Sequence, residues 1–229
     1  MKNILTSLVI TSLAVAGDWN QSLDFGLSVN QGNSESTLLN IAYKADKAWE
    51  SKEFSSANYF NSGSADGTTT MSQLLGNADL KLQHDGFYSK SRLDYLHDDV
   101  ADIGYRAILT ESIGKDWLSN ETTTYSNEAG LGYTSENVSS KKDQFVNLYA
   151  GHKFEHKLSE TGSLFHDLSF FAPVADMDEF FTIANLGAKS MLSDSLSLSV
   201  SLQSRFENEV TVGREKHDLL FVSGISYSF

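Results

Sequence analysis

The chain of 229 residues contains no cysteine, which excludes a disulfide framework as the source of its stability. It has a single proline, Pro173, and neither a linker nor a low-complexity segment, which favours one domain. Beyond the first residues, no apolar run is long enough to cross a bilayer as a helix. Stability must therefore come from the burial of side chains or from contact with a membrane.

Positive charge is also scarce. Lys and Arg number 17 against 30 Asp and Glu, so the net charge is −13. Nucleic-acid binding requires cationic patches that neutralise phosphates. We therefore expect no nucleic-acid partner.

The N-terminus has the features of a secretory signal peptide. Lys2 supplies a positive end, an apolar run covers Ile4–Val15, and Ala14-Val15-Ala16 matches an A-x-A cleavage site. We expect residues 1–16 to be removed on export by the general secretory route, leaving a domain of residues 17–229. No cysteine follows the cleavage site, so a lipoprotein anchor is excluded.

From Trp19 onward, segments that alternate apolar and polar residues are separated by polar turns. The segment Ser195–Glu207 is the clearest, with leucine, valine and phenylalanine on one face and serine, glutamine, arginine and glutamate on the other. A period of two is typical of a β-strand. Twelve strands are expected, at Trp19–Asn30, around Leu39–Ala45, and at Glu53–Asn61, Met71–Gln83, Phe87–His97, Ile103–Gly114, Glu121–Thr134, Asp143–His156, Ser163–Pro173, Glu179–Met191, Ser195–Glu207 and Glu215–Phe229.

Three features favour a membrane barrel over a soluble sandwich. The segments are long enough for a tilted crossing of the hydrocarbon layer. Aromatic residues lie on the apolar face, mostly near strand ends, as interfacial girdles require: Trp19, Tyr43, Tyr59, Phe87, Tyr95, Tyr105, Tyr125, Tyr133, Tyr227 and Phe229. Glycines fall mostly on the polar face, where they let a sheet curl and close: Gly26, Gly104, Gly130, Gly132, Gly151, Gly187 and Gly224, with Gly76 as the exception. We predict an all-β, transmembrane, antiparallel up-and-down barrel of about 12 strands.

Three places depart from this pattern. The third strand puts Phe54 and Phe60 on the inner face, the sixth puts Glu111 on the lipid side, and Phe180 and Phe181 leave the tenth ambiguous. A β-bulge or a shift of one residue in the assignment would explain each of them.

The polar face predicts a lumen that carries charges of both signs, seven acidic and eight basic. The expected lumen-lining residues are Asp24, Lys44, Asp79, Lys81, Lys90, Arg92, Asp94, Arg106, Glu128, Lys153, Glu155, Asp167, Lys189, Arg205 and Glu207. Such a mixture favours ion pairs between strands. These pairs would either fill the barrel or line a narrow polar path for small solutes or ions, and the sequence leaves both readings open.

Catalysis is not expected. His152 and His156 lie on one face of a strand about 13 Å apart, too far to share a metal. His166 and Asp167 point to opposite faces, and neither a G-x-S-x-G nor an H-E-x-x-H motif is present. We expect no catalytic residue, no metal and no cofactor. The alternatives are a barrel lipase or protease, for which we find no nucleophile and histidine at one level of one face, and a soluble periplasmic barrel that binds an apolar ligand.

Two turns are acidic, one with Asp98, Asp99 and Asp102 and the other with Asp176, Asp178 and Glu179. They lack EF-hand spacing. They form either a solvated rim or a place where divalent cations bridge the protein to lipopolysaccharide.

The strand Leu219–Phe229 ends on an aromatic residue with another two positions earlier, and resembles the closing strand of bacterial outer-membrane barrels. That resemblance implies recognition by the barrel assembly machinery through Ile225, Tyr227 and Phe229. The segment Trp19–Ser28 followed by Gln31-Gly32-Asn33-Ser34, together with Ala129–Tyr133, resembles the salt-induced outer-membrane protein family (YdiY-like). This resemblance implies a barrel in the outer membrane of a Gram-negative bacterium, in contact with lipid and lipopolysaccharide and with a structural or envelope-stress role. It implies no activity and no catalytic residues.

Overall fold

The computed structural model describes residues 19–30, 36–210 and 215–229; the expected signal peptide, residues 1–16, lies outside this range. The described residues form twelve strands and no helix. The strands are β1 (Asn20–Asn30), β2 (Ser36–Ala48), β3 (Lys52–Ala65), β4 (Thr68–Gln83), β5 (Tyr88–Asp98), β6 (Ile103–Ser119), β7 (Thr123–Val138), β8 (Lys141–Lys157), β9 (Gly162–Pro173), β10 (Phe181–Met191), β11 (Leu196–Glu207) and β12 (His217–Ser228). In this part of the chain, no helix long and apolar enough to span a membrane is found.

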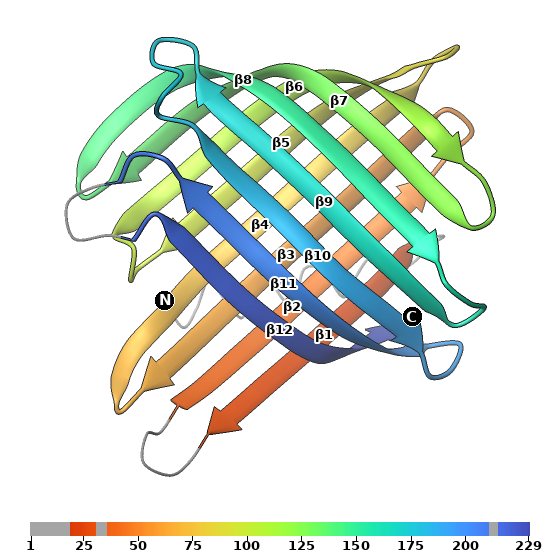
Figure 1. Ribbon diagram of the computed structural model, residues 1–229, viewed down its shortest axis with the longest axis horizontal. Helices are drawn as coiled ribbons and strands as arrows, with labels where there is room; N and C mark the ends of the chain where they lie inside the picture. Colours follow the sequence, from red (N-terminus) through yellow and green to blue (C-terminus); the bar gives the residue numbers. More distant parts are fainter. Residues whose placement is uncertain (1–18, 31–35, 211–214) are drawn as a thin grey trace.

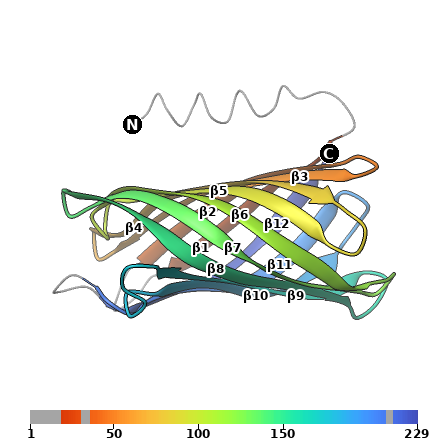
Figure 2. The ribbon, with the colours of Figure 1, turned by 90° about the horizontal axis from the view of Figure 1, so that it is seen from above.

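Each strand pairs antiparallel with its neighbours in the sequence, and β12 pairs with β1 to close the barrel (Figures 1 and 2). The predicted up-and-down barrel of twelve strands is confirmed. The strand β1 begins, and β12 ends, at the same end of the barrel, which we call the terminal end. We call the opposite end the distal end. The longest connection that is described in full, 174–180, lies at the distal end.

Two hairpins at the distal end have two-residue turns. Asp66 and Gly67 have φ of 49° and 75°, and Ser139 and Ser140 have φ of 50° and 64°. Positive φ at both central residues twists the turn in the same sense as the strands that it joins, which is why such turns suit tight hairpins.

The two faces of the wall differ as the alternation predicts. On β11, Leu198 is 44% exposed on the outside while Ser197 beside it is 3% exposed. Thr110, Thr134 and Asn147 are fully buried inside the barrel. The outer surface is therefore apolar and the inside is polar, the reverse of a soluble globular protein.

Glycine lets neighbouring strands meet at two points of the wall. A Cβ atom on Gly130 would lie 2.0 Å from the backbone oxygen of Glu111, and one on Gly224 would lie 2.6 Å from that of Phe25. The second contact belongs to the seam between β1 and β12, whose ladder covers only Ser22–Phe25 on β1. A side chain at Gly224 would therefore obstruct the closure of the barrel.

The expected faces of the third strand were wrong. Tyr59 lines the interior, with the Lys44 ammonium 6.0 Å from its ring centre, and Phe60 lies opposite Ile41 on the outer wall. The outer face of β3 also carries Ser56 and Asn58. Because both faces of this strand mix polar and apolar residues, polarity was no guide to its orientation.

The other two departures from the alternation, at Glu111 and at the start of the tenth strand, have different explanations. The β5–β6 ladder keeps one register from Tyr88 to Leu96, so Glu111 does face outward and no bulge explains it. Its carboxylate accepts a hydrogen bond of 2.8 Å from Ser91. At the start of β10, Phe181 is buried inside, while Phe180 stacks on Phe170 and lies against Phe206.

Candidate functional site: the charged lumen

The inside of the barrel holds a cavity of about 960 Å³. Its lining includes Glu53 at the terminal end and Val100, Ala101 and Glu215 at the distal end, so it extends along the whole barrel. The residues expected in the lumen that line this cavity are Lys44, Asp79, Lys81, Lys90, Arg92, Asp94, Arg106, Glu128, Lys153, Asp167 and Arg205.

The other four expected lumen residues do not line the cavity. Asp24 and Glu207 point inward and bind charged partners, Lys44 at 2.7 Å and Arg106 at 2.7 Å. Glu155 and Lys189 are exposed close to the terminal ends of β8 and β10.

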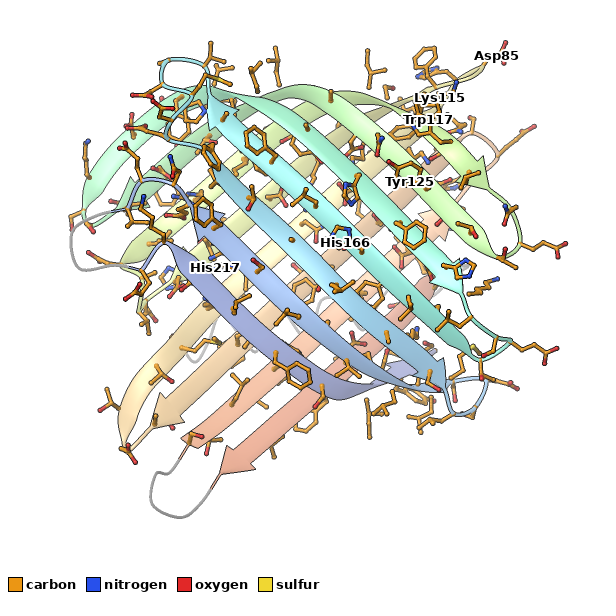
Figure 3. All side chains as sticks on the ribbon, viewed as in Figure 1. Asp85, Lys115, Trp117, Tyr125, His166 and His217 are labelled. Atoms are coloured by element: carbon orange, nitrogen blue, oxygen red, sulfur yellow. The ribbon has the colours of Figure 1, made fainter. Side chains whose placement is uncertain are left out.

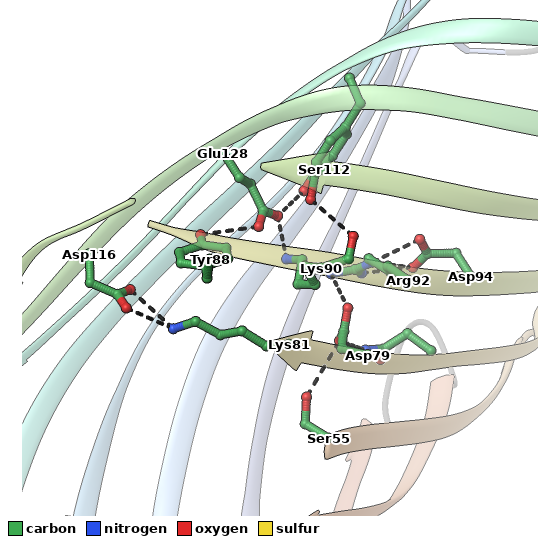
Figure 4. Close-up of polar contacts among 12 residues, drawn as sticks. Ser55, Asp79, Lys81, Tyr88, Lys90, Arg92, Asp94, Ser112, Asp116 and Glu128 are labelled. Atoms are coloured by element: carbon green, nitrogen blue, oxygen red, sulfur yellow. Dashed lines mark hydrogen bonds and ion pairs between the residues drawn. The ribbon is translucent and has the colours of Figure 1, made fainter. Parts of the chain in front are cut away.

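Glu128 on β7 is the centre of a buried polar cluster (Figure 4). Its carboxylate forms an ion pair with Lys90 of β5 and accepts hydrogen bonds from Tyr88 at 3.2 Å and Tyr149 at 2.5 Å. Its side chain is 7% exposed. One carboxylate thus joins three strands, β5, β7 and β8, through an ion pair and two hydrogen bonds inside the barrel.

A second group of charges lies on β4 and β5 (Figure 4). Arg92 binds Asp94 through Nε and Nη2, at 2.8 and 2.7 Å, and its Nη1 lies 3.8 Å from Asp79. Lys81 reaches past β5 to Asp116 of β6, at 2.9 Å. These contacts hold charged side chains against the wall and leave the cavity beside them.

Near the distal end, an ion pair crosses the barrel. Arg106 of β6 donates to Glu136 of β7 at 2.6 Å and to Glu207 of β11 at 2.7 Å. The strands β7 to β10 separate β6 from β11 in the barrel order, so the second bond spans the interior. The guanidinium also lies 5.2 Å from the ring centre of Phe181. We call these residues, Arg106, Glu136, Glu207 and Phe181, the distal clamp, and they narrow the lumen there.

An apolar cluster fills part of the interior beside the distal clamp. Phe171 packs on Tyr149 and Phe181, with ring centres 5.0 and 4.8 Å apart, and Ile108 completes the cluster. These residues occupy polar-face positions of β6, β8, β9 and β10. Of these residues only Phe181 stood out in the sequence, where the alternation leaves the tenth strand ambiguous, because the expected lumen residues were all charged.

Two acidic partners were also missed. Asp116 and Glu136 lie beyond the expected ends of the sixth and seventh strands, but β6 continues to Ser119 and β7 to Val138. The alternation does continue through Lys115, Asp116 and Trp117, which is the signal that could have extended the sixth strand.

Histidines of β8 and β9 lie on the outer wall and form a contact that the sequence did not predict. His152 and His166 are hydrogen-bonded between Nε2 and Nδ1 at 2.7 Å, close to Tyr125 (Figure 3). Asp167 faces the cavity on the other side of the wall. Within the described ranges, no group of three or more His, Cys, Asp or Glu could hold a metal ion.

The expectation that no nucleophile and histidine lie at one level of one face was wrong. Ser204 of β11 and His217 of β12 do lie on one face at one level, with Oγ and Nε2 2.8 Å apart (Figure 3 labels His217). The register places Ser204 opposite Leu219, so this pair is diagonal and could be found only once the pairing of the strands was known. Among the described residues, no carboxylate is hydrogen-bonded to His217.

The acidic turns use their carboxylates locally. Asp98 is buried and accepts hydrogen bonds from Gln73 and from the backbone of Val100 and Ala101. In the other turn, Asp176 accepts one from the backbone of Asp178. Both carboxylates therefore stabilise the turns in which they lie.

The fold is that of bacterial outer-membrane barrels. The structure is similar to one titled NanC porin, with a TM-score of 0.57 at 8% identity, covering 91% of this chain and 98% of that one. A second similar structure is the translocator domain of the autotransporter NalP from Neisseria meningitidis, with a TM-score of 0.49 at 15% identity, covering 100% of this chain and 95% of that one. At such identities the likeness concerns the fold alone.

The chain belongs to the family described as "Protein of unknown function, DUF481", whose model matches residues 23–229. Comparison with curated proteins finds no match.

Proposed function

We propose that this protein is an outer-membrane barrel that passes small polar solutes or ions through a narrow lumen. The observation that carries the proposal is a continuous cavity, whose lining includes residues at both ends of the barrel. A barrel filled by its own side chains would instead have separate pockets at its two mouths.

The chemistry of the lining supports this proposal. Ammonium, guanidinium and carboxylate groups surround the cavity, and Oγ1 of Thr110 and Oδ1 of Asn185 have no hydrogen-bond partner among the described residues. Buried polar atoms of this kind are usually satisfied by water. A hydrated path lined by both signs of charge suits small polar solutes better than apolar ones.

Single-channel conductance of the refolded protein in a planar bilayer tests the proposal. We expect discrete steps, and we expect Arg92→Glu and Arg205→Glu to shift ion selectivity toward cations because both positions line the cavity. Lys142→Glu is the matched control, since this exposed lysine lies on the outer face of β8 at the distal end. Folded, inserted protein that gives no steps would refute conduction. Equal selectivity in all three variants would refute the placement of the charges along the path.

The envelope context is part of the same proposal. The apolar outer wall would contact membrane lipid, the distal turns lipopolysaccharide, and the strand ending in Ile225, Tyr227 and Phe229 the assembly machinery. Export would depend on residues 1–16, and deletion of these residues should keep the protein out of the outer-membrane fraction. The salt-induced role implied by the family resemblance predicts more transcript at high salt, and unchanged transcript would remove that role.

A second candidate function is hydrolysis of lipid esters at the outer wall, and one observation favours it. Ser204 and His217 have the distance that a nucleophile and its general base require. Phospholipid hydrolysis by the purified protein that is lost in Ser204→Ala would establish it. We propose instead that the chain has no catalytic role, so the result that we expect is no phospholipid hydrolysis that depends on Ser204.

A further inference from the structure

The outer face of β3 to β6 carries polar or small residues on four neighbouring strands at the middle of the barrel, and one of them, Glu111, is ionisable. Asn58, Gly76, Ser91 and Glu111 occupy the outer face near the centres of these four strands. Glu111 is eight residues from Ile103 and eight from Ser119, the two ends of β6. On the opposite side of the barrel, Leu202 and Phe221 lie near the middle of β11 and β12, and the polar residue beside them, Ser223, is not ionisable.

Polar groups at this depth are costly in hydrocarbon. Acyl chains offer no hydrogen bonds, and ionisable side chains inside a membrane usually face a protein partner rather than lipid. Glu111 has one bond from Ser91, and Asn58 donates to Ser56 at 3.3 Å. The Glu111 side chain is exposed on the outer wall, and the Asn58 amide donates one of its two hydrogens within the described residues.

The same face is shaped like an interface. A groove of about 400 Å³ runs over Gly76 and Ala78, and its other lining residues are Ser56, Asn58, Leu74, Leu75, Asn77, Leu93 and Tyr95. Beside it, on β6 and β7, stands a ridge formed by Leu109, Ile113 and Leu131, in which Ile113 is 64% exposed. A groove made by small residues next to a ridge of bulky ones allows two walls to approach closely.

We propose that this face, the groove together with the ridge and Glu111, packs against a second copy of the chain. In a two-fold arrangement, the ridge of each copy enters the groove of the other, so both contacts form twice. Glu111 of one copy then lies near Asn58 of the other, whose amide supplies the donor that lipid lacks. A lipid tail could fill the groove, but it would leave the carboxylate without a partner.

The inference rests on the membrane location proposed above but not on conduction. It can be tested in native outer membranes, because the chain has no cysteine of its own and a single introduced thiol is unique. Ser91 lies between groove and ridge, close to where the two-fold axis would pass, so Ser91→Cys should form a disulfide-linked dimer on oxidation. Ser223→Cys is the matched control, because Ser223 is an exposed serine at the middle of β12 on the opposite side of the barrel.

We expect the Ser91→Cys dimer in at least tenfold excess over the Ser223→Cys dimer. We expect Glu111→Leu added to Ser91→Cys to reduce the dimer, and Glu111→Gln, which keeps the hydrogen bond, to retain most of it. Equal crosslinking of both cysteines would show random collision and overturn the inference, as would a disulfide between Ser91→Cys and a cysteine of a different protein. Protein absent from the outer-membrane fraction would overturn the proposed location as well, whereas inserted protein without the dimer would overturn only this inference.

Discussion

The strongest structural prediction concerns Glu128, whose carboxylate holds together β5, β7 and β8. In Glu128→Ala the Lys90 ammonium loses its counter-ion, and the hydroxyls of Tyr88 and Tyr149 lose their acceptor. Removal of one partner from a buried ion pair costs about 3–5 kcal/mol. Lys90 keeps 16% of its side-chain exposure, so lumen water would recover part of this loss. We therefore expect the free energy of unfolding to fall by about 3 kcal/mol.

The assay is urea unfolding of the barrel in lipid vesicles, followed by the fluorescence of its three tryptophans. Asp24→Ala is the control, because its partner Lys44 is 40% exposed, and such pairs contribute about 1 kcal/mol or less. The double variant Glu128→Leu with Lys90→Met removes both charges and should recover part of the stability. A loss below about 1 kcal/mol in Glu128→Ala, no larger than that of the control, would show that the charged lumen is not what holds these strands together.

Three further predictions address the clamp, the interior and the seam. Arg106→Gln removes the bond across the barrel, so single-channel conductance should rise while stability falls, and unchanged conductance would place the path elsewhere. Phe171→Ala empties a fully buried position, so urea unfolding should show a loss of about 3–5 kcal/mol, and a loss near zero would mean that the apolar cluster is not packed. Gly224→Val would put a side chain 2.6 Å from the backbone oxygen of Phe25, so the closed, heat-modifiable form on gels should be lost; normal folding would show that the seam can widen.

The alternation of polarity predicted the architecture because each strand has one face in lipid and the other in the lumen. Where that contrast is strong, as along β11, the side chains fall as expected. It failed at β3, where Ser56 and Asn58 share the outer face with Phe60 and the contrast disappears. When the outer face of a strand mixes polar and apolar residues, the sequence does not show which face is outside. The outer face of β3 is such a face, and it forms part of the surface where we infer a second copy.

Contacts between distant strands could not be predicted. The alternation places Arg106, Glu128 and Glu207 inside, but which charges meet depends on the stagger of the strands and on the diameter of the closed barrel. Ser204 and His217 are a similar case, since their contact is diagonal across one ladder. Periodicity assigns a face to each residue, whereas closure of the barrel decides its partner.

If the lumen conducts as we propose, stability and conduction are coupled, because the same side chains would serve both. The distal clamp ties β6 to β11 and thereby narrows the cavity that we propose as the path. The ion pair across the interior would thus determine how far the lumen is filled, from a closed structural barrel to an open pore. Changes at the distal clamp should lower the free energy of unfolding and raise conductance together. Changes at Asp24, which pairs with Lys44 on the neighbouring strand and does not line the cavity, should leave conductance almost unchanged.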